Sequence, residues 1–215
     1  MYVKELWRYP VKSMAGERIR EITALPLGFE GDRTVLVERR GRVVTSRTDH
    51  RLLGLKGTLG ADGVPRISGH AWDSPEALDL VRTVAGPEAR LVRNESAERF
   101  DVLPLLVATD GAIAHMGVDG RRFRPNIVVG GVEGLTERSW PGRRLRIGGA
   151  IIEATQLRGR CVMTTYDPDT LKQDLNVLRR IVRELDGTMA LDCSVVEGGS
   201  IHEGDPVSVL RDDES

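Results

Sequence analysis

The sequence predicts a mainly β protein of the α+β class, built as a barrel and not as a parallel α/β sheet. Three observations lead to this prediction. Most apolar segments are short and rich in β-branched residues, frequent glycines and prolines separate them, and few windows repeat with a helical period. A chain of 215 residues fits one domain, or two small domains that share a face.

The first half of the chain is expected to consist of strands and turns followed by one helix. Residues 34–37 form a β-branched segment, residues 38–42 read as a hairpin connection into 43–45, and residues 51–66 continue as glycine-rich strands. The helix opens at Ser74-Pro75-Glu76, where a capping serine precedes a proline and an acid, and it ends at Gly86-Pro87. We place the boundary between the first and the second half of the chain at 88–92.

The second half is expected to alternate strands with two helices. Strands are predicted at the positions 103–108, 126–129, 145–154 and 193–210. Thr109 and Asp110 predict the start of a short helix over 111–116. A longer helix is predicted over 170–185, because Leu171, Leu175, Leu178, Val182 and Leu185 recur at steps of three and four residues.

Composition argues against several classes of protein. The formal net charge of −1 creates no global field for nucleic acid or membranes. No window approaches the roughly 18 apolar residues of a membrane helix, and the first residues lack the apolar run of a signal peptide. We therefore expect a cytoplasmic protein. The only two cysteines, Cys161 and Cys193, fall short of the four that an iron–sulfur cluster usually takes, and no histidine spacing suggests zinc.

Cys161 stands in the most informative stretch of the chain. Arg160 precedes it, Thr164 and Thr165 follow it, and a turn signal, Asp-Pro-Asp-Thr, occupies 167–170. A neighbouring guanidinium favours the thiolate, which is the form that attacks electrophiles and binds soft metals. The alternative is a small buried hydrophobic residue, and Cys193, within a strand pattern, is read in that way.

Two further motifs accompany this stretch. Residues 121–127 read Arg-Arg-Phe-Arg-Pro-Asn-Ile, and residues 9–13 read Tyr-Pro-Val-Lys-Ser, followed by Gly-Asp-Arg at 31–33. Together with the cysteine motif, and in this order, they resemble the MOSC domain preceded by its N-terminal β-barrel domain. The resemblance implies a MOSC β-barrel packed against a smaller N-terminal β-domain. We place the N-terminal domain at 1–92 and the MOSC domain at 93–211.

The resemblance also implies a site for molybdenum cofactor (molybdopterin). Cys161 would be the sulfur ligand of molybdenum, or the carrier of a persulfide. Matching positions that would hold the cofactor are Lys12, Ser13, Arg33, Thr109, Arg124, Asn126, Arg160 and Thr164. Four of them have a plainer alternative: Lys12 as a solvated lysine, Arg33 paired with Asp32, Thr109 capping a helix, and Thr164 present for its strand propensity. Relatives often carry glycine where this chain has Leu171, which puts the substrate in doubt.

Three hypotheses follow. The first is an oxidoreductase that reduces small N-hydroxylated substrates, such as amidoximes, with electrons from a ferredoxin- or cytochrome-type reductase. The second is a sulfur-carrier module in which a cysteine desulfurase charges Cys161. The third is a β-domain for protein interaction with a decayed site. Nucleic acid is disfavoured because aromatic residues make up only 4% of the chain, too few for a stacking platform around 121–124.

Overall fold

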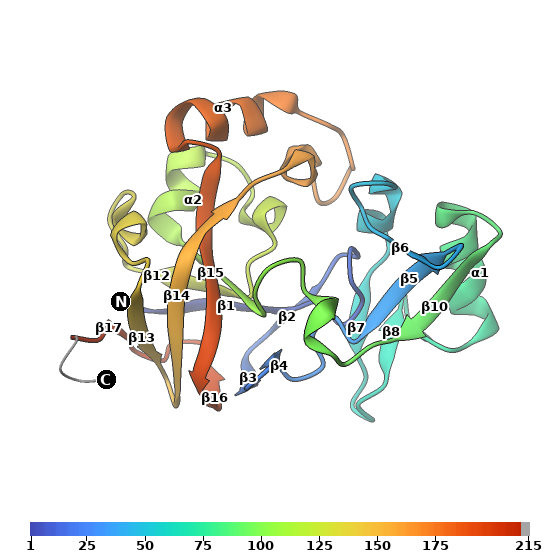
Figure 1. Cartoon of the computed structure of the whole chain (residues 1–215), viewed down its shortest axis with the longest axis horizontal. Helices are drawn as coiled ribbons and strands as arrows, with labels where there is room; N and C mark the ends of the chain where they lie inside the picture. Colours follow the sequence, from blue (N-terminus) through green and yellow to red (C-terminus); the bar gives the residue numbers. More distant parts are fainter. Residues whose placement is uncertain (212–215) are drawn as a thin grey trace.

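The computed structural model describes residues 1–211 and centres on one large mixed sheet (Figure 1). The strand order in this sheet is β17-β13-β14-β15-β11-β12-β1-β2. Its strands are β1 (Tyr2–Arg8), β2 (Glu17–Ile19), β11 (Leu105–Thr109), β12 (Ile127–Gly130), β13 (Arg143–Ile147), β14 (Ala150–Gly159), β15 (Thr188–Glu197) and β17 (Val207–Val209). The β11–β12 pair is parallel and the other pairs are antiparallel. The acidic residues Asp212, Asp213 and Glu214 lie outside the described residues.

Three small sheets of three strands each complete the β structure. Their strands are β3 (Glu21–Leu25), β4 (Gly28–Phe29), β5 (Val35–Arg39), β6 (Arg42–Val44), β7 (Gly57–Leu59), β8 (Pro65–Ile67), β9 (His70–Ala71), β10 (Ala89–Arg93) and β16 (Gly199–His202). The α-helices are α1 (Pro75–Ala85), α2 (Asp110–Met116) and α3 (Leu175–Leu185). The short 3₁₀ turns are η1 (His50–Gly54), η2 (Ala97–Arg99), η3 (Gly120–Phe123), η4 (Thr136–Ser139) and η5 (Val162–Thr165). This confirms the predicted mainly β fold.

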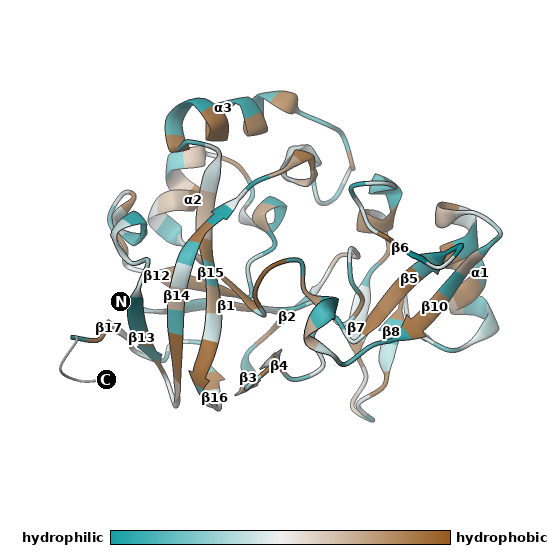
Figure 2. Cartoon of the chain, in the orientation of Figure 1, coloured by the Kyte–Doolittle hydropathy of each residue, from teal (hydrophilic) through white to brown (hydrophobic). Residues whose placement is uncertain are grey.

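Two apolar clusters divide the molecule into a larger and a smaller part. The larger cluster lies along the central sheet and includes Leu6, Ile127, Leu145 and Ile152, all fully buried. The smaller one fills the space between α1 and the β5–β6–β10 sheet, whose strands β5 and β10 are hydrophobic along most of their length (Figure 2). Burial of these side chains is the main force that holds each part together.

The larger part is built from both ends of the chain, because the chain begins there. β1 pairs with β12 and β3 pairs with β16, so the first 25 residues are hydrogen-bonded to segments from the second half. The predicted division at residue 92 falls within β10, and it stays a prediction. The chain crosses from the larger part to the smaller one between Phe29 and Val35, and it returns over residues 94–104. Segment 9–16, which joins β1 to β2, also buries Val11 and Met14 in the smaller cluster.

Several local predictions are confirmed with their reasons. Ser74 accepts a hydrogen bond from Ala77 N and caps α1, and Gly86 ends that helix. The β5–β6 hairpin turns at Arg40-Gly41, both with positive φ, as a tight two-residue hairpin requires. Thr109 caps α2, as expected for this position.

The predicted start of the long helix is wrong, because α3 begins at Leu175 and not at residue 170. Asp167 Oδ1 accepts hydrogen bonds from the backbone of Asp169 and Thr170, and Leu171 has a φ of 56°, which no helix contains. Asp174 is the residue that caps the helix. The buried face is Val177, Ile181 and Leu185, whereas Leu175 and Val182 of the predicted apolar stripe are exposed.

The predicted strands over 51–66 are also partly wrong. Residues 50–54 form the 3₁₀ turn η1, and strands begin only at Gly57. Leu52 and Leu53 are both buried in this turn.

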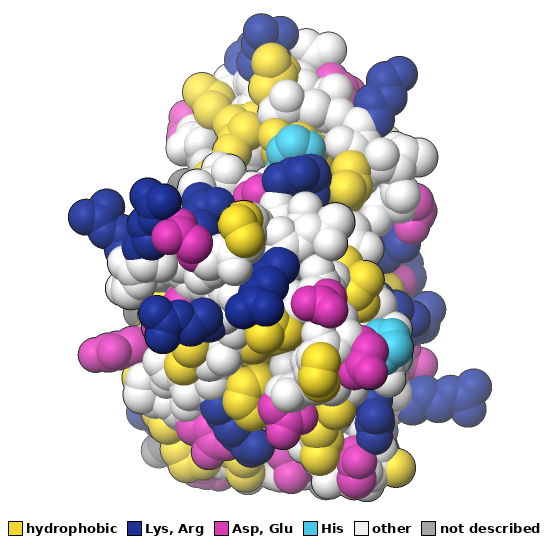
Figure 3. Space-filling view, turned by 90° about the vertical axis from the view of Figure 1, so that its right-hand side faces the viewer, with side chains coloured by type: hydrophobic (Ala, Val, Ile, Leu, Met, Phe, Trp, Pro, Cys, Tyr) yellow, Lys and Arg dark blue, Asp and Glu magenta, His cyan; other side chains and the backbone are white. Residues whose placement is uncertain are grey.

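Two features of the surface bear on function. Viewed from the α1 end, basic and acidic side chains are interspersed with apolar ones (Figure 3), as the near-zero net charge implies. Within residues 1–211, no helix has both the length and the apolar character needed to span a membrane.

Candidate functional site

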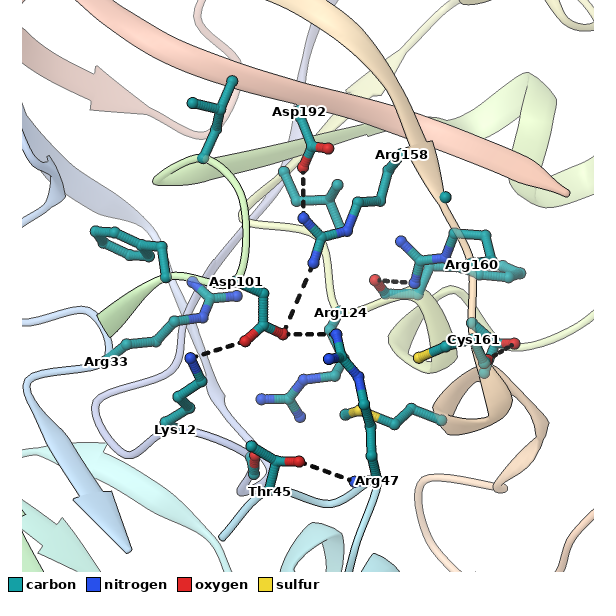
Figure 4. Close-up of a pocket in the computed structure, with 18 of the residues that line it drawn as sticks. Lys12, Arg33, Thr45, Arg47, Asp101, Arg124, Arg158, Arg160, Cys161 and Asp192 are labelled. Atoms are coloured by element: carbon teal, nitrogen blue, oxygen red, sulfur yellow. Dashed lines mark hydrogen bonds and ion pairs between the residues drawn. The ribbon is translucent and has the colours of Figure 1, made fainter. Parts of the chain in front are cut away.

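A cavity at the boundary between the two parts brings together most of the residues that the sequence motifs single out (Figure 4). It encloses about 780 Å³ of empty space, solvent at its mouth included. Of the predicted site residues, it is lined by Lys12, Ser13, Arg33, Arg124, Asn126, Arg160, Cys161 and Thr164. These come from segments more than a hundred residues apart in sequence, so only the fold makes them neighbours.

Cys161 lies where β14 has just ended and the turn η5 begins. Its sulfur lines the cavity, and its side chain is half-buried. Thr164 donates from Oγ1 to the carbonyl oxygen of Cys161 at 2.9 Å, and its backbone N–H donates to the same oxygen. The tight turn therefore fixes the backbone that carries the thiol. The second cysteine, Cys193, is fully buried in β15, as its reading as a structural residue requires.

Three cavity residues adopt a backbone conformation that residues other than glycine rarely enter. Ser13, Arg33 and Arg124 have φ values of 70°, 55° and 56°. Such a conformation costs of order 1 kcal/mol or more per residue, and it tends to occur at functional sites. The turns that hold these side chains are therefore shaped at some cost in stability, which is the pattern expected of a binding site.

Asp101 connects the cations on one side of the cavity. Its carboxylate lies 2.8 Å from Lys12 Nζ, 3.0 Å from Arg47 Nη2 and 3.8 Å from Arg158 Nη2 (Figure 4). Burial alone would raise the pKa of Asp101, but the hydrogen bond from Lys12 and the charges of the two arginines lower it. Asp101 is therefore an anion that orders three cations, and Lys12 also donates to Arg99 O at 2.7 Å.

Arg33 and Asn126 are tied to the buried Asp32. Arg33 forms an ion pair with Asp32, which is the plainer alternative for this residue, and it also lines the cavity. Asn126 donates to Asp32 Oδ2 and to Trp7 O, both at 3.3 Å, and accepts from Leu106 N at 3.2 Å. The amide of Asn126 thus holds β1, β11 and the Asp32 turn in register, and its hydrogen bonds go to protein groups.

Two guanidinium groups at the cavity have no acidic partner among the described residues. Arg124 lies 4.4 Å from the centre of the Tyr9 ring, and Arg160 donates to Phe123 O at 2.8 Å. Burial lowers the pKa of both arginines to about 10, so both remain charged at neutral pH. Burial is also the main cause that raises the pKa of Tyr9 to about 12.

Thr109 lies apart from the cavity. Its hydroxyl accepts from Ala112 N at 3.1 Å as the cap of α2, and it donates to the buried Glu137 at 3.1 Å. Burial raises the pKa of Glu137, and the hydrogen bond from Thr109 opposes this shift because it stabilises the carboxylate. Capping, the plainer alternative, thus accounts for the contacts of Thr109, and its role in cofactor binding stays a prediction.

Four charged residues at the cavity were not found from the sequence: Arg47, Asp101, Arg158 and Asp192. Arg158 pairs with the buried Asp192 at 2.9 Å. A signal for Arg158 did exist, since it stands two positions before Arg160 and alternate residues of a strand share a face. The other three lie outside the motifs, and no local pattern marks them.

The lining suits a bound anion. Seven cationic side chains but only two carboxylates, Asp101 and Asp192, line the cavity, although the whole chain carries a net charge of −1. The hydroxyl of Ser13 and the guanidinium of Arg124 make no hydrogen bond within residues 1–211, and Arg160 Nε is a buried donor without a partner. Arg122 Nε is a second buried donor without a partner at this cavity. The lining therefore offers free donors of the kind that a phosphate engages.

The described residues offer no site for a metal ion held by protein side chains alone. Across the described part of the chain, no three side chains from histidine, cysteine, aspartate and glutamate come together. Among the described residues, Cys161 is the one thiol at the cavity, and the Met163 thioether is a second, weaker soft group. The donor set therefore fits a group that brings most of its own metal ligands and a phosphate, and that takes a single thiolate from the protein.

The fold and the site define a protein of the MOSC type. A model of the MOSC domain matches residues 105–208, and a model of the MOSC N-terminal beta barrel domain matches residues 1–95. The chain belongs to the MOSC-domain family, as its motifs suggest.

Similar curated proteins include mitochondrial amidoxime reducing components 1 and 2. Mitochondrial amidoxime reducing component 2 of Rattus norvegicus is 35% identical, over 98% of this chain and 83% of its own length. The Homo sapiens component 2 is 27% identical, over 95% and 82% of the two chains. Among solved structures, the YuaD protein of Bacillus subtilis superposes with a TM-score of 0.54 at 15% identity, over 97% of this chain and 94% of that one. This last match concerns the fold alone.

Proposed function

We propose that this protein is a molybdenum-cofactor-dependent reductase of N-hydroxylated compounds, with Cys161 as the protein ligand of the metal. The observation that supports the proposal most is the cavity itself, in which one thiol faces seven cationic side chains drawn from remote segments. The names of the similar curated proteins point to amidoximes as the substrates.

The proposed roles of the residues follow from their chemistry. Cys161 supplies a thiolate, which suits a high-valent metal that two cofactor sulfurs already hold. Ser13 and Arg124 bind the cofactor phosphate, because both have unused donors, and Lys12 and Arg33 add positive charge from positions that Asp101 and Asp32 fix. Arg160 borders the thiol, and Asn126 holds the turn in place.

The reaction needs electrons and protons from outside the chain. Reduction of an N-hydroxylated group consumes two electrons and two protons, breaks the N–O bond, and releases water. The bound cofactor supplies the two-electron chemistry. An external ferredoxin- or cytochrome-type reductase supplies the electrons. The task of the protein is to hold the cofactor and to shape a partly enclosed pocket beside Cys161.

The test compares two cysteine variants. Protein from a host that makes the cofactor is assayed with benzamidoxime and a chemical reductant, so that no partner protein is needed. Cys161→Ser is expected to lose at least about 99% of the activity, because a metal ligand is removed. Cys193→Ser, a matched change in a buried strand, is expected to keep most of it. Full activity in Cys161→Ser would refute the metal-ligand role.

A second candidate is the sulfur-carrier module. It is favoured by the setting of Cys161, a half-buried free thiol beside cationic groups that would stabilise a persulfide anion. A cysteine desulfurase would be the partner. Mass spectrometry after incubation with a desulfurase and cysteine separates the two functions. A persulfide on Cys161 in protein that binds no molybdenum would favour the carrier, whereas bound metal and no persulfide would favour the reductase.

A further inference from the structure

A second cavity lies against the one that holds Cys161. The two share Arg122, Arg124 and Met163 as walls, and Met163 is only two residues from Cys161, in the same turn. The second cavity encloses about 1,030 Å³ of empty space, solvent included. We call it the aromatic pocket. The residues that line it alone include none of the predicted cofactor positions, although Pro168 and Asp169 belong to the cysteine motif.

Rings and apolar side chains form much of its wall. Trp7, Tyr9 and Tyr166 line it, three of the nine aromatic residues in the sequence, together with Leu53, Met163 and Pro168. Tyr166 stacks on His50 with a centroid distance of 4.6 Å and an interplanar angle of 4°. His50 does not line the pocket, so its stacking holds the ring plane of Tyr166 from the side away from the pocket. Rigid aromatic walls favour a flat ring as ligand.

The charges of the pocket are unbalanced. Its lining contains five cations and two acids. Both acids are already paired, Glu17 with Arg8 at 2.8 Å and Asp169 with Arg121 at 2.6 Å. Lys56, by contrast, lines only this pocket and has no acidic partner within residues 1–211. A cationic ligand would therefore meet unpaired positive charge and no free carboxylate.

We infer that the aromatic pocket binds the ring of an uncharged aromatic N-hydroxylated substrate and disfavours the reduced product because of its charge. The inference rests on the proposed reductase function. Reduction of an amidoxime breaks the N–O bond, takes two electrons from the donor and two protons, and gives an amidine and water. The amidine then takes up a further proton at neutral pH and becomes a cation. The same walls that accept the neutral substrate thus repel the product, which promotes its release.

Binding is measured by calorimetry on the full chain as purified, at low ionic strength and without a reductant, so that nothing turns over. The probes are benzamidoxime, acetamidoxime and benzamidine. Benzamidoxime is expected to bind about tenfold more tightly than acetamidoxime, which lacks the ring. It is also expected to bind about tenfold more tightly than benzamidine, which has the ring but a positive charge, and this second ratio is expected to shrink as salt is added.

Variants locate the site. Trp7→Leu and Tyr166→Leu are each expected to weaken the binding of benzamidoxime about fivefold to tenfold. The matched control, Tyr2→Leu, changes an exposed tyrosine outside the pocket and is expected to change nothing. Lys56→Gln is expected to strengthen the binding of benzamidine and to leave the affinity for benzamidoxime unchanged. Thermal unfolding confirms that each variant is folded before it is titrated.

The outcomes separate this inference from the proposed function. Equal or tighter binding of benzamidine, or unchanged affinity in both ring variants, overturns the inference even if the protein reduces amidoximes. If the predicted affinities hold but the protein contains no molybdenum and reduces nothing, the pocket is a ligand site and the reductase proposal is the part that fails.

Discussion

Lys12 Nζ lies 2.8 Å from Asp101 Oδ1, a contact between residues 89 positions apart that joins the two parts of the molecule at the mouth of the cavity. Arg47 and Arg158 approach the same carboxylate from other elements. Three of the seven cationic side chains of the cavity therefore share one acid.

Asp101→Asn is expected to destabilise the protein by about 1–2 kcal/mol at neutral pH, because three cations lose their shared partner. The pKa of Asp101 is lowered in the folded state. A lowered carboxyl pKa gives stability that is present above the unfolded value of about 3.9 and is lost as the pH falls through the folded value. Chemical unfolding should thus show a constant difference from the wild type above pH 5, which narrows below about pH 4.

The control for this prediction is Asp62→Asn, which removes an exposed ion pair with Arg66. A surface pair of this kind contributes about 0.5 kcal/mol or less. If Asp101→Asn is no more destabilising than Asp62→Asn, the carboxylate does not organise the cavity.

Inorganic phosphate is expected to stabilise the cofactor-free protein, because Ser13 and Arg124 offer unused donors. At about five times the dissociation constant, the gain is about 1 kcal/mol. Ser13→Ala and Arg124→Gln are each expected to lose most of it in thermal unfolding. Arg90→Gln, an exposed change on β10, is expected to keep it. Equal stabilisation of all four proteins would mean that phosphate acts on the surface in general.

The two cysteines are expected to differ in reactivity. Cys193 is fully buried, and burial raises its pKa, so both access and ionisation disfavour attack. Cys161 is half-buried at the cavity. Iodoacetamide followed by peptide mass spectrometry should label Cys161 in the native protein, and Cys193 only after denaturation. Native labelling of Cys193 at a similar rate would contradict the burial described for β15.

Gly16→Ala is expected to disturb the site from a distance. A β-carbon at Gly16 would lie 2.5 Å from Arg8 O and 2.5 Å from the Tyr9 ring, against which Arg33 and Arg124 also lie. We expect a loss of about 3 kcal/mol in unfolding free energy. Gly41→Ala meets no atom within 4 Å and suffers only its positive φ, so about 1 kcal/mol is expected. Equal losses would mean that the Gly16 contact relaxes freely.

Local chemistry explains which parts of the fold were predictable. The caps of α1 and α2 and the Arg40-Gly41 turn are set by single residues with strong backbone preferences, so sequence reasoning found them. The start of α3 was missed because the hydrogen bonds of Asp167 and the positive φ of Leu171 override an apolar spacing that suits a helix.

The candidate site was predictable only where motifs recorded it. Lys12, Arg33, Arg124 and Cys161 were found in this way, and the fold brings them to one cavity. Asp101 and Arg47 lie in irregular segments. Their ion-pair partners in the cavity are at least 54 positions away in the sequence. Such contacts leave no periodic signal, so a single sequence cannot reveal them.

The central claim is that Cys161 binds molybdenum, and the most direct measurement is X-ray absorption at the molybdenum edge. Wild-type protein from a cofactor-producing host is compared with Cys161→Ser and Cys193→Ser. We expect the number of sulfur ligands per metal to fall by one in Cys161→Ser, with an oxygen in its place, and to stay unchanged in Cys193→Ser. An identical sulfur shell in all three proteins, or purified wild type that contains no molybdenum, would contradict the claim.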